Sequence, residues 1–297
     1  MAYFATVFRL WYKTEIKKMK LIQTINELRA ELDVLRREGK TIGLVPTMGA
    51  LHAGHASLVK RAVAENDVVV VSDFVNPTQF GENEDLGSYP RDIKRDAALC
   101  DAAGVELLFN PSPEEMYYKD NCTFVDMNRL TDVLCGKTRP IHFSGVCSVV
   151  TKLFHIVTPD RAYFGQKDAQ QLAVIRRMVR DLNFDIEIVG CPIVREADGL
   201  AMSSRNTYLN EEERKAALVL SQAVRLGEEL VEAGEKNAAV IKEKMIAHIE
   251  AEPLAKIDYV EIVDAQSLEP VSEIQGEILS AMAVYIGKTR LIDNFIR

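Results

Sequence analysis

Cysteine is scarce in this chain of 297 residues, with five copies and none in a CxxC pair. Their number is odd, and no other feature points to secretion, so we expect no disulfide framework. Reduced thiols in a cytoplasmic protein are the predicted state. The five residues are Cys100, Cys122, Cys135, Cys147 and Cys191.

Positive charge is also in short supply, because 36 Lys and Arg stand against 44 Asp and Glu and leave a formal net charge of -8. A protein that mainly binds nucleic acid needs clustered Lys and Arg to neutralise phosphates. We therefore expect small-molecule substrates and no nucleic-acid partner. With 47% hydrophobic and 27% charged residues, the chain has the composition of a globular protein long enough for two domains.

The N-terminal apolar run is too short to cross a bilayer. It includes Phe4, Leu10 and Trp11, and Lys17 and Lys18 follow it, which is the wrong side for the charge of a signal peptide. We expect no membrane partner. Met19 is the predicted functional start, and residues 1–18 are predicted to be an upstream extension that can be disordered. An anchor at a membrane surface is the weaker alternative.

Helical and buried-strand patterns alternate from residue 19 to residue 193. Such alternation predicts right-handed crossovers and a doubly wound, parallel α/β sheet, which is a Rossmann-like nucleotide-binding domain. A patterned helix is expected to begin at Met19-Lys20 from the spacing of its apolar residues, and the alternation of elements gives its range as about Thr24 to Glu38. The other predicted helices begin at His55 or cover 91–103, 146–157 and 168–182, and the predicted strands cover 41–45, 67–74, 105–109, 161–164 and 185–191.

The pattern changes after residue 193. Asn210 and Glu213 form a capping box that begins a long amphipathic helix, and Gly234 ends it. A second helix precedes Pro253, and strands are predicted at 257–263 and 278–286. Residues 194–297 are therefore expected to form a smaller α+β domain that closes over the site, with 194–206 as the hinge.

The segment Pro46–His55 contains the pattern His52-Ala53-Gly54-His55, where a predicted strand becomes a helix. The free N–H groups of a helix start favour an anion, and glycines let the backbone approach a ligand. Two imidazoles three residues apart can donate hydrogen bonds to phosphate oxygens. Zinc binding is an alternative, but a zinc site needs a third protein ligand, and no nearby Cys or Glu has the usual spacing. An incidental pattern also stays open at this point.

Further polar segments follow other predicted strands or the hinge. In Gly165-Gln166-Lys167-Asp168, the lysine can contact a phosphate, and the aspartate can bind ribose hydroxyls or only cap a helix. Met202 to Asn206 offers hydroxyls and a guanidinium to a polyphosphate, although a polar linker is the commoner meaning of such a string. Gln79 and Gln171 carry amides suited to a hydroxylated carboxylate, and each alone could be a surface glutamine.

Taken together, several segments resemble the pantothenate synthetase (pantoate–β-alanine ligase) family of the HxGH nucleotidylyltransferase superfamily. The matching segments are PTMGALHAGH, DFVNPTQF, YPR, HFSGV, FGQKDAQQL, VREADGLAMSSRN and KTRLIDN. The resemblance implies a HUP-type fold and ATP-dependent ligation of (R)-pantoate and β-alanine, through pantoyl adenylate, with release of AMP and diphosphate. It also implies Mg²⁺ with the ATP and a homodimer.

The resemblance also assigns roles to individual residues. His55 would be the proton donor, Gln79 and Gln171 would bind pantoate, and Gln79 would also lie near β-alanine. The implied ATP-binding residues are Met48, Gly49, Ala50, Leu51, His52, Ala53, Gly54, His55, Gly165, Gln166, Lys167, Asp168, Val194, Met202, Ser203, Ser204 and Arg205. Pocket walls of lower rank are Asn76, Tyr89, His142 and Arg195. Asp92 and Asp96 are weighed as contacts of Mg²⁺, with an exposed helix surface as the better account of both.

Two other functions compete with this one. A related adenylyltransferase would use the same histidines to transfer AMP to a phosphate, and it would stop there. A catalytically silent nucleotide-binding regulator would keep the fold but lose His55 or Lys167, and both are present.

Overall fold

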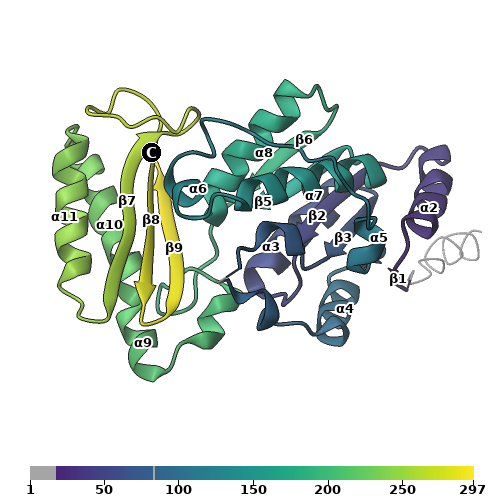
Figure 1. Ribbon diagram of the computed structural model, residues 1–297, viewed down its shortest axis with the longest axis horizontal. Helices are drawn as coiled ribbons and strands as arrows, with labels where there is room; N and C mark the ends of the chain where they lie inside the picture. Colours follow the sequence, from purple (N-terminus) through teal and green to yellow (C-terminus); the bar gives the residue numbers. More distant parts are fainter. Residues whose placement is uncertain (1–17, 83) are drawn as a thin grey trace, which may run out of the picture.

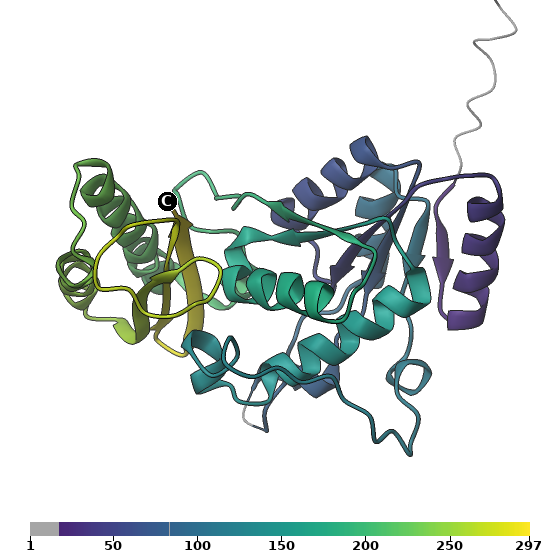
Figure 2. The same ribbon diagram turned by 90° about the horizontal axis from the view of Figure 1, so that it is seen from above.

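The computed structural model describes residues 18–82 and 84–297, which form two lobes that lie side by side (Figures 1 and 2). The predictions made for residues 1–17 lie outside this range. Within it, no helix combines the length and the apolar character needed to cross a membrane.

The larger lobe is built on a parallel sheet of six strands in the order β1-β4-β3-β2-β5-β6. This confirms the predicted doubly wound α/β architecture, and β2 and β3 are in register from Ile42 opposite Val68 to Thr47 opposite Asp73. The strands are β1 (Lys20–Ile22), β2 (Ile42–Thr47), β3 (Val68–Asp73), β4 (Leu107–Phe109), β5 (Arg161–Gly165) and β6 (Glu187–Cys191).

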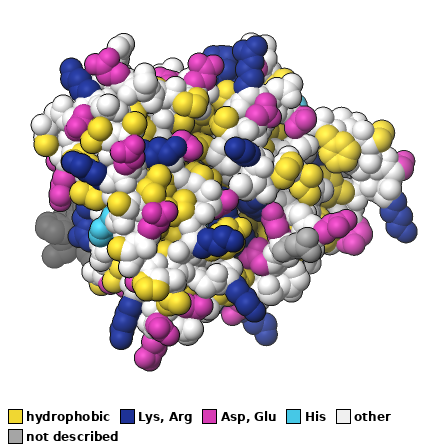
Figure 3. Space-filling view, turned by 60° about the vertical axis from the view of Figure 1, so that its left-hand side comes forward, with side chains coloured by type: hydrophobic (Ala, Val, Ile, Leu, Met, Phe, Trp, Pro, Cys, Tyr) yellow, Lys and Arg dark blue, Asp and Glu magenta, His cyan; other side chains and the backbone are white. Residues whose placement is uncertain are grey.

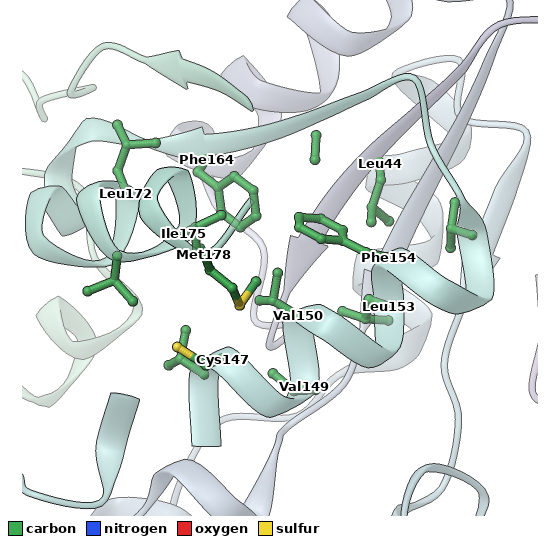
Figure 4. Packing of buried hydrophobic residues seen from close by; sticks show 14 of the residues in the cluster. Leu44, Cys147, Val149, Val150, Leu153, Phe154, Phe164, Leu172, Ile175 and Met178 are labelled. Atoms are coloured by element: carbon green, nitrogen blue, oxygen red, sulfur yellow. The ribbon is translucent and has the colours of Figure 1, made fainter. Parts of the chain in front are cut away.

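Helices cover both faces of this sheet because its central strands are apolar on both sides. In β3, Val68 and Val70 belong to the core under one set of helices, and Val69 and Val71 belong to the core under the other. The first set is α2 (Ile25–Arg37), α7 (His142–Val157) and α8 (Ala169–Asp181), and the second is α3 (Ala53–Glu65) and α4 (Ile93–Ala102). Figure 4 shows side chains of α7 and α8, such as Phe154 and Ile175, packed with Phe164 and Leu44 of the sheet.

The prediction of a helix beginning at Met19-Lys20 is wrong. Residues 20–22 form β1, which pairs with β4, and helix α2 begins only after Thr24, whose hydroxyl accepts a hydrogen bond from the Glu27 amide. The spacing of Ile22, Ile25 and Leu28 fits a helix, but the cap and the pairing with a distant strand decide the structure.

Two predicted helix starts were too late. Helix α3 begins at Ala53, two residues before the expected start, and His52 is its N-cap. Helix α7 begins at His142 rather than near Val146. Its first turn contains Gly145, a poor helix former, but this glycine lies against the turn after β3, and a Cβ there would be 2.5 Å from the Thr78 carbonyl oxygen. Two short helices, α5 (Pro113–Met116) and α6 (Leu134–Thr138), were not predicted.

The smaller lobe packs three helices against an antiparallel sheet in the order β7-β8-β9. The capping box of Asn210 and Glu213 is present, and Gly234 follows the predicted helix end with φ +91. The long helix is, however, divided at Ala217, and strand β9 was not predicted. The elements are α9 (Glu211–Ala216), α10 (Leu218–Glu232), α11 (Ala238–Glu250), β7 (Ala255–Asp264), β8 (Ile278–Ile286) and β9 (Thr289–Ile296).

The segment predicted as a hinge connects the lobes and has local order. Arg195 and Ala201 form an antiparallel bridge, and Arg195 makes an ion pair of 2.7 Å with the buried Asp293 of β9. A 3₁₀ turn, η4 (Ser204–Tyr208), follows. On the face of the molecule in Figure 3, acidic and basic side chains are interspersed rather than gathered by sign.

Candidate active site

The loops that follow β2, β3 and β5 meet at one cavity of about 210 Å³. This is the carboxyl edge of the parallel sheet, where ligands bind in open α/β folds. Most of the predicted residues line it: Met48, His52, Gly54, His55, Gln79, Gly165, Lys167, Asp168, Gln171, Val194, Met202, Ser203, Ser204 and Arg205, together with Asn76 and Tyr89. Seven others do not line it: Gly49, Ala50, Leu51, Ala53, Gln166, His142 and Arg195. His142 lines the larger cavity instead, whereas Arg195, predicted as a pocket wall, lines neither.

A second cavity of about 1090 Å³ lies between the two lobes. Its lining shares Lys167, Asp168, Gln171, Ser203 and Arg205 with the first cavity. The two spaces therefore meet at the phosphate-binding candidates. A substrate in the smaller cavity and a second one in the larger cavity would be in contact there.

His52 and His55 form the first turn of α3 together. The Nδ1 atom of His52 accepts a hydrogen bond of 3.1 Å from the Gly54 amide, and Nδ1 of His55 accepts one of 3.3 Å from the His52 amide. This is a capping box built from two imidazoles. Gly54 is required here because a Cβ at this position would lie 2.8 Å from Cε1 of His52.

These hydrogen bonds fix the tautomer of both rings. An Nδ1 that accepts carries no proton, so the neutral ring has its proton on Nε2. Burial lowers the pKa of His52 to about 4, with Lys167 adding to the effect. Burial also lowers the pKa of His55 to about 3, helped by His52 and Lys167. At neutral pH both rings are therefore uncharged hydrogen-bond donors through Nε2.

Asp96 of α4 stabilises the turn of residues 49–51, which precedes the two histidines. The amides of Ala50 and Leu51 each donate to the Asp96 carboxylate over 2.8 Å, and Gly49 has φ +76. Asp96 is only 1% exposed, so the interpretation as an exposed helix residue is wrong for it. Asp92 instead caps α4 by accepting from the Arg95 amide.

Gln79 is oriented by a buried polar network. Its Oε1 accepts a hydrogen bond of 3.1 Å from the Asn76 side chain, and its Nε2 lies 3.0 Å from the Met48 sulfur. Asn76 in turn accepts from the Tyr117 hydroxyl over 2.8 Å. Gln79 is therefore no surface glutamine. Gln171 lines both cavities from the start of α8.

Lys167 and Asp168 lie between β5 and α8. The Asp168 side chain makes no capping hydrogen bond, so a role as helix cap alone is wrong, and its carboxylate is exposed at both cavities. Across the described residues, Lys167 has no ion-pair partner. Its loop is held by Asn294 of β9, whose side-chain amide donates to the carbonyls of Gln166 and Lys167 over 3.1 and 2.8 Å.

The 194–206 connection brings Ser203, Ser204 and Arg205 to the opposite wall. Ser203 caps the η4 turn by accepting from the Arg205 amide, and the Ser204 and Tyr89 hydroxyls lie 3.3 Å apart. The Arg205 guanidinium donates to both carboxylate oxygens of Asp85, over 3.0 and 2.9 Å. A polyphosphate that binds Arg205 would therefore share it with Asp85.

Sequence reasoning missed Arg139 and Glu84, which line the larger cavity as an ion pair. Arg139 also donates to the Gln79 carbonyl over 3.4 Å, and Nδ1 of His142 lies 3.1 Å from the same oxygen. Burial, with Arg139, lowers the pKa of His142 to about 4. Arg139 stands three residues before the HFSGV segment, but no spacing rule singled it out.

The chain was compared with known proteins. The family model described as pantoate–β-alanine ligase matches residues 20–296. The chain belongs to the pantoate–β-alanine ligase family. Among curated relatives, the pantothenate synthetase of Clostridium acetobutylicum is 63% identical over 93% of this chain and 99% of that protein. That of Clostridioides difficile is 62% identical over 93% and 98%.

Solved structures of the ligase family share the fold. Pantothenate synthetase from Thermus thermophilus superposes with a TM-score of 0.89 at 47% identity, over 93% of this chain and 99% of that one. The pantoate–β-alanine ligase of Francisella tularensis, solved with β-γ ATP and β-alanine, gives a TM-score of 0.77 at 35% identity over 94% and 97%. The fold, the HUP-type class and the activity predicted from the sequence are thus confirmed.

A ligase of this family handles a triphosphate, so the fit of a metal ion matters. Within residues 18–82 and 84–297, no three His, Cys, Asp or Glu side chains are grouped so that they could hold one. The donors at the cavity are instead single groups, such as the Asp168 carboxylate and the hydroxyls of Ser203 and Ser204. They fit a Mg²⁺ ion that phosphate oxygens and waters hold, not a protein cage.

Proposed function

We propose that this chain joins (R)-pantoate to β-alanine in the paired cavities, at the expense of ATP. In the first step a pantoate carboxylate oxygen attacks the α-phosphorus, the bond to the bridging oxygen breaks, and diphosphate leaves with the electron pair. In the second step the amine of β-alanine attacks the acyl carbon of pantoyl adenylate, loses a proton, and displaces AMP. Adenylation thus converts a poor leaving group into a good one.

The observation that carries this proposal is the convergence of uncharged and charged donors on one cavity. Nε2–H of His52 and of His55 would donate to phosphate oxygens while the anhydride breaks. Lys167 would add positive charge at the β and γ phosphates, beside Ser203, Ser204 and Arg205. Since its pKa lies far below neutral, His55 acts as a hydrogen-bond donor in this proposal, and the role of proton donor requires the triphosphate to raise that pKa.

The remaining residues would position the substrates. Asp168 would accept hydrogen bonds from the ribose hydroxyls, and Val194 would lie on the adenine side. Gln79 and Gln171 would hold the hydroxyls and carboxylate of pantoate, and the larger cavity would admit β-alanine beside Gln79. Residues 49–51 would act through their backbone, because a turn held by Asp96 places Met48 and His52 in the wall.

Several wider features belong to the same proposal. Mg²⁺ would arrive with ATP and neutralise part of the triphosphate charge. The lobe of residues 194–297 would move at the 194–206 connection to close the larger cavity, and the domain boundary at 193 would mark this hinge. A cytoplasmic homodimer completes the proposal, and sedimentation of the purified chain tests the dimer.

The decisive experiment measures AMP formation with each substrate omitted in turn. AMP should appear only when ATP, pantoate and β-alanine are all present, in an amount equal to pantothenate. ADP as the product, or AMP release that is indifferent to pantoate, would refute the proposal. Turnover without β-alanine would favour the competing adenylyltransferase.

A further inference from the structure

Two aspartates that take no part in the proposed chemical steps lie close together beneath the Gly49–Leu51 turn. Asp73 is the last residue of β3 and Asp96 lies in the first turn of α4. Side chains alternate along a strand, so Ser72 faces the cavity, and Asp73 faces the side covered by α3 and α4. The side chains of the pair are almost inaccessible, at 6% and 1% exposure.

Gly49 shows how closely the pair lies under the loop. A Cβ at this glycine would be 2.4 Å from Oδ1 of Asp73 and 3.2 Å from Oδ2 of Asp96. The two carboxyl groups thus lie close together beneath this glycine, and Asp96 accepts hydrogen bonds from the Ala50 and Leu51 amides. Asp96 thus holds two consecutive residues of the turn between Met48 and His52, and Asp73 lies close against the preceding residue, Gly49.

Two carboxylates in contact away from water cannot both be charged, so one carries a proton. Asp96 already accepts hydrogen bonds from two backbone N–H groups, so the proton is placed on Asp73, which can donate it to Asp96. Burial and the neighbouring Asp96 raise the pKa of Asp73 to about 7. The thiol of Cys100, also on α4, lies near the two aspartates. Burial and both aspartates raise the pKa of this thiol to about 12.

The other groups around the pair are neutral. Asn110, after β4, donates its side-chain amide to the Asp73 carbonyl over 2.7 Å. On the β2 side, Thr47 donates to the Ser72 carbonyl and accepts from the Gly49 amide. The protonation of Asp73 is thus influenced by its burial and by the neighbouring Asp96 carboxyl, which is not a cation.

We propose that Asp73 is a positioning residue for ATP, which as a neutral acid donates a hydrogen bond to Asp96 and thereby keeps the Gly49–Leu51 turn in place. Loss of its proton puts two charges under the turn, and repulsion between them displaces Asp96 from the Ala50 and Leu51 amides. ATP binding therefore weakens with rising pH. This inference rests on the proposed function only for the identity of the nucleotide.

The test compares Asp73→Asn with the wild type, since an asparagine amide donates the same hydrogen bond and does not titrate. Affinity for a non-hydrolysable ATP analogue is measured by calorimetry from pH 6 to pH 8. A group with a pKa of about 7 is about one-tenth protonated one pH unit higher, so the wild type should lose roughly tenfold in affinity over this range. The affinity of Asp73→Asn should change by no more than about twofold over the same range. This comparison removes the pH dependence that comes from ionisation of the nucleotide, because both proteins share it.

Asp92→Asn is the matched control, because Asp92 lies on the same helix but caps it at the surface. It should follow the wild-type pH profile. Equal slopes for wild type and Asp73→Asn would overturn the inference. If Asp73→Asn does not fold, NMR of the carboxyl carbons of the wild type decides, because an Asp73 that titrates below pH 5 also overturns it. Binding is measured without turnover, so a failed ligation assay would refute the proposed function and leave this test standing.

Discussion

The imidazole rings of His52 and His55 lie with their centroids 4.1 Å apart and their planes inclined by 31°. Each ring is oriented by a backbone amide that donates to its Nδ1. The Nε2–H groups are therefore placed before any ligand arrives, which is the preorganisation that makes hydrogen-bond donors effective in catalysis.

His55→Ala should lower kcat by about a hundredfold to a thousandfold, the usual cost of removing one preorganised donor at a transition state. The circular dichroism spectrum should remain that of the folded protein, and Tm should fall modestly, because the variant loses the capping hydrogen bond from the His52 amide. The measurement is AMP formation at saturating substrates. His248→Ala is the control, since His248 of α11 lines neither cavity and hydrogen-bonds with Gln222 of α10. Wild-type turnover in His55→Ala would remove the ring from the mechanism.

Lys167→Ala should reduce kcat/KM for ATP roughly tenfold to a hundredfold, because a hydrogen bond to a charged group contributes about 1.5 to 3 kcal/mol. The KM for β-alanine should stay near the wild-type value. Lys60→Ala is the matched control, since Lys60 is exposed on α3 outside both cavities. An equal loss in both variants would point to a general charge effect instead of a local contact.

Gly49→Ala should destabilise the protein by about 1 to 3 kcal/mol, because φ +76 strains any other residue. The added Cβ would also press on Oδ1 of Asp73, so affinity for ATP should fall as well. Thermal unfolding and nucleotide titration measure the two effects. Gly276→Ala should be close to neutral, because no heavy atom lies within 4 Å of its Cβ position.

Acid should destabilise the protein through its buried neutral histidines. The unfolded chain takes up protons below the ordinary histidine pKa of 6.5, whereas folded His142 does so only near 4. Stability from this group is thus complete above pH 6.5 and is lost progressively down to pH 4. His142→Gln should remove about 2 kcal/mol of the loss seen between pH 7.5 and pH 5. Parallel Tm curves for variant and wild type over this range would contradict the assignment.

The features that the sequence predicted correctly depend on neighbours along the chain. The junction at His52, the capping box at Asn210 and the glycine after α10 are set within a few residues, so local patterns reveal them. Strand β1 was misassigned because it is held by β4, which is distant in the sequence. Strand β9 was missed although it pairs with its neighbour along the chain, β8, across the Gly287-Lys288 turn.

The motifs of the site were predictable from the sequence, but the residues that hold those motifs in place were not. Lys167, Gln79, Ser203 and Ser204 stand in recognisable sequence motifs, and the resemblance to a family assigned roles to them. Asp96 looked like a surface residue because its helix is amphipathic, and only the fold shows that the Gly49–Leu51 turn lies over it. Arg139 likewise could not be recognised from the sequence, because its ion-pair partner Glu84 is far away along the chain.

Asn294 donates two hydrogen bonds to the loop of Lys167, and both acceptors are carbonyl oxygens, those of Gln166 and Lys167. A link of this kind is indifferent to which side chains the loop carries. Substitutions at 166 and 167 can therefore change the charge offered to a nucleotide without undocking the last strand, and substitutions at 294 can loosen the docking without changing that charge. The charge offered to a nucleotide and the docking of the last strand are therefore separable properties of this protein, open to independent engineering.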